Sequence, residues 1–496
     1  MRFEHQGHGG GALAENAALS FAIFVVGMAT GLIIVAILDQ MDIVGRGLPA
    51  ILVSGVVLVV LFAAIAGRTD RRAVFLVDAR NVGPGMTGAA TAAAALPATL
   101  LLSETGALHA RGFDGLPVVI GSVGGFMLVA MMLAPFVRKS GAVTVADFLA
   151  LRFGDATGVL AALVSVAVGL QLLTLQLSAF GTLGAAVAGI PHEAAVLGGA
   201  GLTLLVVMLG GMRAVTWTQA LLYLVLATTI VPTAVLLGWR VNGHLFPPLA
   251  MGAALREIGD LEFALLAKKL ADGASLKRYA VPYLTSDALN AAGIGIGMML
   301  GMAAMPHVLG RSLAARSPHE ARSGAAWAMF LVLLAALMLP ALAAFGKLEL
   351  LRQLAMGRAL GDLPSWMVEA GRLGMVKVCG VAAADADAVA AACRSVGGNK
   401  GLLRLQDVRV EPETFLLALS AMTGLPRMLA ALLAAAIAAA ALAASVGLAL
   451  ALAATLSHDV LHRLVDRSAP DRRRLLMARV AALAAVGAAT FAAFRH

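Results

Sequence analysis

The sequence predicts an all-α, polytopic membrane protein. Of its 496 residues, 60% are hydrophobic and only 13% are charged, and the mean hydropathy is +0.90. A soluble globular chain is much less apolar and carries about twice that share of charged residues. The apolar residues also form runs of roughly 18 or more, the length that an α-helix needs to cross a bilayer. The net charge of +9 is therefore assigned to loops between spans, and nucleic acid is excluded as a partner.

Eleven apolar runs, each bounded by charged or turn residues, are the predicted membrane spans. The first two form a pair of helices within residues 1–82, ahead of a larger core. The first run lacks a compact basic n-region and a clear cleavage site, so it is expected to be a retained span. The runs lie near 18–38, 49–67, 83–110, 115–137, 157–189, 194–212, 215–239, 286–310, 324–346, 425–456 and 474–494.

The third run, Gly83 to Ala110, is expected to be a broken helix. Pro97 lies near its middle, where it removes a backbone donor and clashes with the preceding turn. The chain near Ala93 to Thr99 should therefore unwind and leave carbonyl groups free. Such groups are tolerated at membrane depth only where they line a cavity or meet protein, and many transporters build ion and substrate sites from interrupted spans.

Basic residues gather in alternate short loops, which sets the predicted topology. By the positive-inside rule these loops are cytoplasmic, so the N-terminus lies inside and His496 outside in a multi-pass protein of the cell inner membrane. The two long polar insertions, at about 241–285 and 347–426, then both fall outside. The basic loop residues are Arg68, Arg71, Arg72, Arg80, Arg138, Lys139, Arg152, Arg213, Arg311, Arg316, Arg322, Arg463, Arg467, Arg472, Arg473 and Arg474.

Two cysteines, Cys379 and Cys393, share the second insertion. They form one disulfide if the insertion faces an oxidising compartment, or they are two unrelated thiols. No third cysteine is present to complete a metal cage, and neither insertion has zinc-ligand spacing, a nucleotide-binding glycine pattern or a nucleophile elbow. The chain is therefore not expected to be an enzyme or to hold a cofactor.

The segment Val137 to Gly154 follows the fourth span and mixes basic residues with an apolar face. It is expected to be an amphipathic connector against the inner membrane surface. Asp147 is near enough to Arg152 in sequence to form a local ion pair.

Several motifs, in order along the chain, resemble the signatures of the sodium:solute symporter family. The resemblance is nearest to its cation/acetate symporter branch, and it runs from about Phe75 to about Phe494. The motifs are FLVDARNVGPG (75–85), ARGFDGLPVVIGSVGG (110–125), RKSGAVTVADFLALRFG (138–154), LQLSAFGTLGAAVAG (175–189), GGMRAVTWTQ (210–219), GMMLGMAAMPHVLGRSLAARSPHEARSG (297–324) and ATLSHDVLHRL (454–464).

The resemblance implies a LeuT-like core of two inverted five-helix repeats whose first and sixth helices are unwound around a central site. The first repeat is expected at 83–240 and the second at 286–496, with its own break near Pro306. The sequence supports this pairing, because glycines and Pro306 interrupt the opening helix of the second repeat as Pro97 interrupts the first. The second repeat is expected to be incomplete, since its fifth helix has no matching run.

A sodium site is also implied by the resemblance, between carbonyl groups of the first broken helix and the eighth core helix. The alanines of the eighth helix offer no hydroxyl, and Ser445 is displaced by one residue, which is about 100° around a helix. The coupling ion is therefore left as sodium or a proton. The positions that match the family are Ala93, Leu96, Ala440, Ala443 and Ala444.

Polar residues within the spans are the candidates for substrate contact or coupling. Glu104 offers a proton route, or it pairs with Arg111 near the outer interface. His307 and Arg311 are suited to gate an anion, although the end of a span is an ordinary place for both. The remaining candidates project into the bundle or form hydrogen bonds between helices. They are Thr99, Ser103, Gln171, Gln176 and Asn290.

These observations together predict a secondary active symporter in the lipid bilayer. Its substrate is expected to be a small organic anion, an acetate-like monocarboxylate, because the positive dipole ends of two broken helices suit a carboxylate. Sodium or a proton drives it by alternating access. The alternative is a transport-incompetent membrane protein, either a truncated symporter or a receptor-like sensor.

Overall fold

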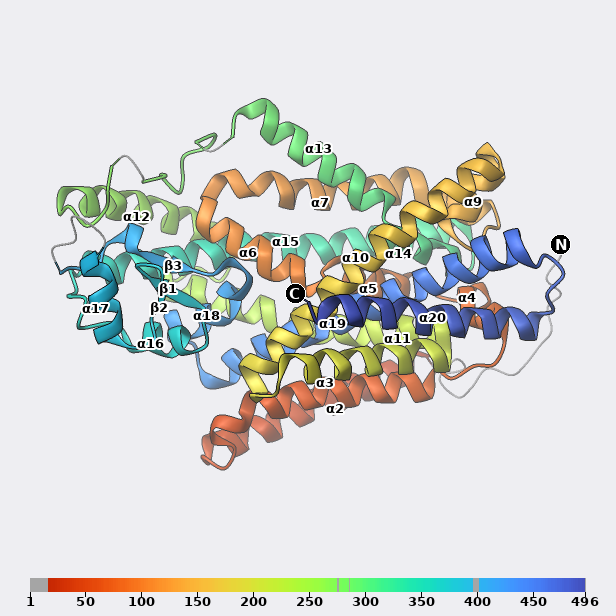
Figure 1. Cartoon of the computed structure of the whole chain (residues 1–496), viewed down its shortest axis with the longest axis horizontal. Coiled ribbons are helices and arrows are strands. Elements are labelled where there is room, and N and C mark those ends of the chain that lie inside the picture. The colour runs from red at the N-terminus through yellow and green to blue at the C-terminus, as the bar shows by residue number, and fades with distance from the viewer. Residues whose placement is uncertain (1–16, 274–275, 285, 396–400, 496) are drawn as a thin grey trace.

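The computed structural model describes residues 17–273, 276–284, 286–395 and 401–495. The predicted sides of the membrane for the N-terminal residue and for His496 concern residues outside these ranges. The helices of the bundle, with the short segments that continue them, run roughly along the longest axis of the molecule (Figure 1). They are α2 (Ala17–Gln40), α3 (Leu48–Ala66), α5 (Pro84–Ala95), α6 (Ala98–Arg111), α7 (Leu116–Leu128), α8 (Ala134–Lys139), α10 (Asp155–Ala188), α11 (His192–Asn242), α13 (Ala288–Ala304), α14 (Pro306–Leu309), α15 (Pro318–Ala355), α19 (Arg427–Ala454) and α20 (Asp471–Ala493).

The predicted basic loops meet at one end of the bundle, which we call the basic end. The short helices α4 (Arg72–Val77) and α9 (Val145–Phe153) also lie there, at the right of Figure 1. Contacts between loops far apart in sequence hold this end together, so the loops assigned to one side do share a side. The contacts are Arg72–Asp471 at 2.9 Å, Arg213–Asp78 at 2.8 Å, Arg479–Asp70 at 2.9 Å, and Arg138 donating to the carbonyl of Ala315.

Eight helices of the described chain are long and apolar enough to cross a membrane, or nine if α13 and α14 form one span. Two of these stretches each contain a reversal. The stretch Ala98–Lys139 turns at Gly112, whose φ of 62° and ψ of −127° no helix contains, before α7 and α8 return to the basic end. α11 turns at Gly211, whose φ is 53° and ψ is −134°. With both reversals counted, the described chain crosses eleven times, as predicted.

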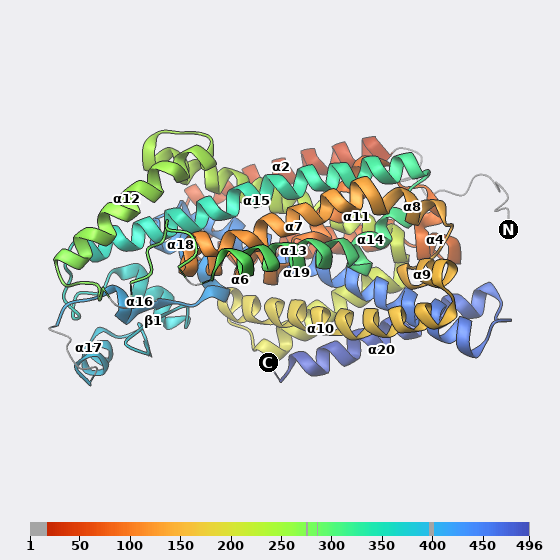
Figure 2. The same cartoon turned by 90° about the horizontal axis from the view of Figure 1, so that it is seen from above.

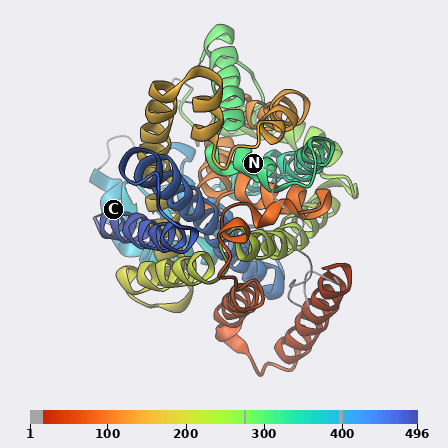
Figure 3. The same ribbon diagram turned by 90° about the vertical axis from the view of Figure 1, so that its right-hand side faces the viewer.

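The helix α2 lies at the margin of the bundle (Figure 3), and none of its apolar window is buried. Large apolar side chains such as Ile33 on α2 and Leu58 on α3 are 60% and 66% exposed. Exposed aliphatic residues along whole helices suit a hydrocarbon environment. By contrast, the apolar window of α19 is 83% buried, and its many alanines let neighbouring backbones approach closely.

The two long insertions gather at the other end of the molecule, which we call the opposite end. The first contains α12 (Pro247–Ala267), which packs on α15 through two hydrogen bonds, of 2.7 and 2.8 Å, from Arg352 to Glu257. The second contains α16 (Ser365–Arg372), α17 (Ala386–Ser395) and α18 (Phe415–Met422), which lie left of the bundle in Figure 2. Both insertions are therefore folded, whereas the sequence indicated only polar loops.

A three-stranded antiparallel sheet, in the order β2-β1-β3, forms the centre of the second insertion. β1 (Val376–Val378) pairs with β2 (Val381–Ala382) and with β3 (Val408–Val410). Cys379 and Cys393 form a disulfide that ties the β1–β2 turn to α17, with their Cα atoms 5.2 Å apart. Of the two alternatives for these cysteines, the structure has the disulfide.

Candidate functional site

The first break separates α5 from α6 near the middle of the bundle. Leu96 leaves helical geometry, with φ of −113° and ψ of 60°, and Pro97 is extended, with ψ of 154°. Pro97 has no N–H to donate to the carbonyl of Ala93, which is its helical partner four residues earlier. Ala93 and Leu96 are 0% and 2% exposed. The predicted break is therefore confirmed, and it places backbone oxygen inside the protein.

The second break separates α13 from α14 at Met305, where ψ changes to 119° ahead of Pro306. The helix axis bends there by 48°. His307, in the first turn after the break, is 9% exposed and makes a hydrogen bond to the backbone of Ala94, beside the first break. The two interrupted helices therefore meet, as the predicted pairing of the two breaks requires.

Arg311 follows the second break in a short 3-10 turn (Gly310–Ala314) that folds its side chain into the bundle. It is only 4% exposed. Its Nη1 atom lies 3.1 Å from the hydroxyl oxygen of Thr216 and 3.1 Å from the sulfur of Met212, both on α11. Within the described residues no carboxylate lies within 4.0 Å of this guanidinium. A buried charge without a counter-ion costs several kcal/mol, so Arg311 is poised to receive an anion.

A cavity of about 40 Å³ adjoins Arg311. His307 and Pro306 line it from the second break, Met212 from α11 and Gly447 from α19. A cavity needs about 10–15 Å³ to hold one water, so this one accommodates a group of a few heavy atoms, the size of a carboxylate. The sequence left Arg311 as either an anion gate or an ordinary span-end residue, because it does not show the turn that directs the side chain inward.

Gln219 on α11 lies beside this cavity and was not among the predicted site residues. It is fully buried, and its Nε2 atom donates a hydrogen bond of 2.6 Å to the carbonyl of Ala443 on α19. Its Oε1 atom has no hydrogen-bond partner among the described residues. A Cβ atom added at Gly447 would lie 2.5 Å from Nε2 and 3.6 Å from Nη2 of Arg311. Gly447 thus leaves the space that both polar side chains occupy.

The positions expected to bind sodium are all buried where α19 packs against α5 and α6. Ser445 supplies the hydroxyl on this stretch of α19, and it is 1% exposed. The carbonyl of Ala443 already accepts from Gln219. The other positions on α19, Ala440 and Ala444, have no side-chain oxygen, so a cation there depends on backbone carbonyls and on neighbouring amide oxygens.

The predicted polar candidates are divided between the interior and the surface. Thr99, at the start of α6, accepts a hydrogen bond of 2.6 Å from Nε2 of Gln176 on α10. Gln176 is 1% exposed, and its Oε1 atom has no partner among the described residues. Ser103 is exposed and donates to the carbonyl of Thr99 within its own helix. Glu104 is partly buried on α6.

Gln171 and Asn290 do not project into the bundle. Gln171 is exposed on the outer face of α10. Asn290 is exposed in the first turn of α13, where its backbone N–H donates to the carboxylate of Asp287, the residue that caps the helix. Neither position could be assigned from the sequence, because an apolar run that is hydrophobic on all sides does not show which face turns inward.

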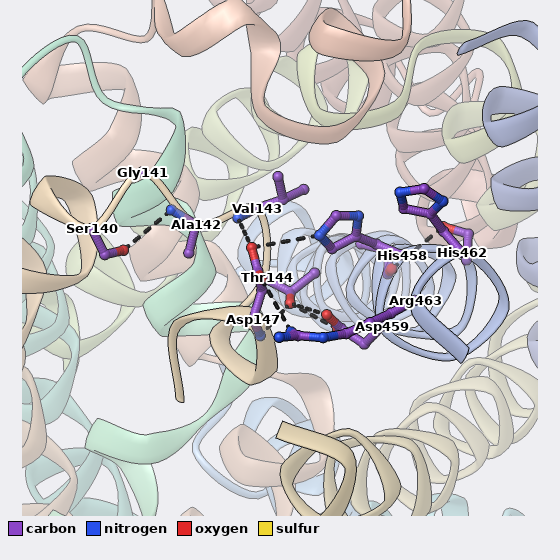
Figure 4. Close-up of polar contacts among 12 residues, drawn as sticks. Ser140, Gly141, Ala142, Val143, Thr144, Asp147, His458, Asp459, His462 and Arg463 are labelled. Carbon is purple, nitrogen blue, oxygen red and sulfur yellow. Dashed lines mark hydrogen bonds and ion pairs between the residues drawn. The ribbon is translucent and has the colours of Figure 1, made fainter. Parts of the chain in front are cut away.

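A polar cluster at the basic end joins α9 to the π-helix Thr455–Val465 (Figure 4). Thr144, which also lines the cavity, caps α9 and donates to the carboxylate of Asp459 at 2.7 Å from Oδ2. Asp147 lies 3.5 Å from Nε2 of His458 and 3.4 Å from Nη1 of Arg463. The expected pairing of Asp147 with Arg152 is therefore wrong, because the π-helix Thr455–Val465 brings Arg463 to Asp147 instead.

The electrostatics of this cluster favour a closed contact over a metal site. Burial raises the pKa of Asp147, but hydrogen bonds from His458 and from the backbone of Val143, with the charges of His458 and Arg463, outweigh it and leave the pKa below its usual 3.8. Ligand atoms of Asp147, His458 and Asp459 lie within 4.8 Å of one another, close enough to hold a metal ion. Arg463 already pairs with one of the two carboxylates of this group, Asp147, so we interpret the cluster as a latch.

Comparisons with known proteins agree with this architecture. A sequence model described as the Sodium:solute symporter family matches residues 75–351. An uncharacterized symporter of Cupriavidus necator is 26% identical, over 86% of this chain and 74% of its own length. The Monocarboxylic acid transporter of Corynebacterium glutamicum is 28% identical over 53% of this chain and 48% of its own.

A solved structure is similar over nearly the whole chain. It is the substrate-bound, outward-open state of a Na⁺-coupled sialic acid symporter, with a TM-score of 0.65 at 15% identity. The similarity covers 90% of this chain and 82% of that one. At this identity it shows a shared fold.

Proposed function

This chain belongs to the sodium:solute symporter family, and we propose on that basis that it carries a small organic monocarboxylate together with sodium. Membership makes it a multi-pass membrane transporter and not an enzyme. The substrate class, the coupling ion and the residues below are the parts that we propose.

The observation that carries the proposal is the unpaired Arg311. Its guanidinium is buried just after the second helix break, hydrogen-bonds Thr216, and has no acidic partner within 4.0 Å in the described chain. A planar guanidinium binds a carboxylate through two parallel hydrogen bonds. A substrate carboxylate would therefore neutralise Arg311, and a small organic tail fits the limited space in the closed cavity. The monocarboxylate named for the Corynebacterium glutamicum relative is of the same class.

Sodium is proposed as the coupling ion from the family and from the available oxygens. Sodium needs several oxygen ligands, and this region offers the carbonyl of Ala93, which Pro97 leaves without its helical donor, and the hydroxyl of Ser445. The unpartnered amide oxygens of Gln176 and Gln219 are buried in the same bundle. They are suited to replace the hydroxyl groups that Ala443 and Ala444 lack.

The proposed orientation places the basic end in the cytoplasm. Arginine-rich short loops favour that side, and the Cys379–Cys393 disulfide at the opposite end is favoured by an oxidising compartment. In this orientation the latch of Asp147, Asp459 and Arg463 closes the cytoplasmic side of the cavity. We further propose that repeats at 83–240 and 286–496 move against each other to expose the site alternately to each side.

Uptake into proteoliposomes tests this function. Labelled acetate and pyruvate should accumulate under an inward sodium gradient and not under an equal choline gradient or a pH gradient alone. A neutral analogue of similar size, such as acetamide, should not accumulate. Uptake driven by the pH gradient without sodium would reject the coupling ion, and sodium-driven uptake of the neutral analogue would reject the carboxylate. Binding without any uptake would favour the receptor-like alternative.

A further inference from the structure

A second cavity, of about 260 Å³, lies at the opposite end, well separated in the fold from Arg311. It is enclosed by the last turn of α6, by α15, by the chain that follows α12 and by β3 of the second insertion. Nothing in the transport cycle proposed above requires it. Its polar lining residues are His109, Asp272, Lys277, Lys347, Gln406 and Arg409.

The charge of this lining is positive. Lys277, Lys347 and Arg409 face one carboxylate, Asp272, which also lies near Arg404. Arg409 is mostly exposed and its contact to Glu411 is loose, at 3.8 Å. Three ammonium or guanidinium groups around one small cavity repel one another, and a bound anion relieves that repulsion.

Lys347 extends from α15 into this lining. Within the described residues it forms no ion pair at 4.0 Å or less. Glu262 acts on it from a greater distance, and an oxygen of that carboxylate already accepts a hydrogen bond of 3.0 Å from the backbone of Tyr279. The donors of Lys347 are therefore available to a ligand.

His109 is an independent sign of a ligand. It is only 5% exposed, it stacks on Phe415 with ring centres 4.3 Å apart, and it lines the cavity. Its ring makes a hydrogen bond to the backbone of Ala343, but its Nδ1 atom has no hydrogen-bond partner among the described residues. Buried polar atoms are almost always paired, so an unpaired ring nitrogen at a cavity wall indicates that a molecule with a polar group completes the site.

The cavity also adjoins the outer half of the first broken helix. β3 leads directly to Pro412, which rests against Gly106 of α6 so closely that a Cβ there would lie 2.1 Å from the Pro412 carbonyl oxygen. His109 is three residues further along the same helix. An occupant of the cavity would therefore touch both the insertion and the helix half that borders the transport site.

We propose that this cavity is a second binding site, which captures a small organic carboxylate at the opposite end before it reaches Arg311. The ligand class rests on the proposed function, while the existence of an anion site rests on the cavity itself. Lys347 and Lys277 neutralise the carboxylate, and His109 pairs with a polar atom of the ligand. By the measure used for the first cavity, this volume admits acetate and pyruvate with room to spare.

Titration calorimetry of the full chain in lipid nanodiscs, with pyruvate and acetate as probes, tests this site. Two binding events are expected in the unchanged protein. Arg409→Gln and Lys277→Gln each should weaken binding at this second cavity about tenfold or more, since hydrogen bonds to charged groups are of that strength. Lys347→Gln should abolish binding at this cavity. Arg311→Gln should remove only the binding event at the transport site.

The matched control is Arg372→Gln, which changes an exposed arginine of the same insertion that does not line the cavity. It should leave both events unchanged. Arg409 and Lys277 are exposed, so their variants should fold, which thermal unfolding checks. A single binding event that Arg409→Gln and Lys277→Gln leave unchanged, or equal affinities in Arg409→Gln, Lys277→Gln and Arg372→Gln, would overturn the proposal. Cavity binding without any transport would leave this site standing and reject the proposed function alone.

Discussion

Arg311→Gln removes the buried cation from the transport site while keeping a side chain of similar reach. If the substrate carboxylate is the missing counter-ion, truncating one partner of that buried charge pair costs about 2–5 kcal/mol of binding free energy. At about 1.4 kcal/mol for each tenfold change, affinity falls roughly 30-fold to several thousand-fold. The affinity of Arg311→Lys should lie between those of the unchanged protein and Arg311→Gln, because lysine keeps the charge but loses the planar, two-pronged geometry.

The stability of the ligand-free protein should respond in the opposite sense. Arg311 is 4% exposed and lacks an acidic partner, so its removal relieves a desolvation cost of several kcal/mol. The loss of its hydrogen bond to Thr216 costs about 1 kcal/mol. The midpoint of thermal unfolding should therefore stay constant or rise in Arg311→Gln.

Two assays on the same preparation separate these effects. Equilibrium binding of labelled pyruvate in the presence of sodium measures affinity, and thermal unfolding without ligand measures stability. The control is Arg316→Gln, because Arg316 lies on the same segment but is exposed and donates at 3.0 Å to the side chain of Asn81. A strongly lowered unfolding midpoint with unchanged affinity in the folded fraction would refute the reasoning, since Arg311 would then be a structural residue.

Three further changes test neighbouring parts of the account. Gly447→Ala should reduce uptake about tenfold or more, because its Cβ would lie 2.5 Å from the Gln219 amide. Adding Gln219→Ala should remove this clash and restore part of the uptake. No recovery in the double variant would argue against the steric cause. Cys379→Ser should destabilise the second insertion by about 3 kcal/mol, as expected for a loop of this size, and unchanged resistance to limited proteolysis would argue against it. Arg463→Gln removes ion pairs with Asp147 and Asp155 and should therefore open the latch. In a protein without its native cysteines, a cysteine placed in the cavity lining by Ala451→Cys should then react faster with a thiol reagent. An unchanged labelling rate would show that the latch does not restrict access to the cavity.

The large features of the fold could be predicted because they depend on composition along the chain. Apolar runs give the crossings, and Pro97 and Pro306 mark the two breaks, although Pro232 and Pro340 lie within helices that continue through them. The basic loops likewise share one end, as Arg213 and Asp78 demonstrate. These signals are local and need no knowledge of neighbours.

The site itself depended on long-range packing, which a single sequence does not contain. Arg311 was an anion-gate candidate at an otherwise ordinary position, and the sequence could not show that the turn after Pro306 directs its side chain toward Thr216 on another helix. Gln219, a polar residue inside a predicted span, was the signal that could have been used. Asp147 pairs with Arg463, which is more than 300 residues away in sequence, and not with its neighbour Arg152.

The folded second insertion was missed for a different reason. Its strands have only three, two and three residues, too few for an alternating pattern to emerge. The Cys379–Cys393 pairing, in turn, depends on the β1–β2 turn and α17 coming together. The spacing of the two cysteines along the chain therefore could not decide between a disulfide and two unrelated thiols.

The most direct test of the central claim is the initial rate of labelled pyruvate uptake by proteoliposomes under an inward sodium gradient, compared between Arg311→Gln and Arg316→Gln. Sodium-dependent uptake by Arg316→Gln is expected at the rate of the unchanged protein, and almost none by Arg311→Gln. Equal uptake by the two variants would contradict the claim that Arg311 receives the carboxylate.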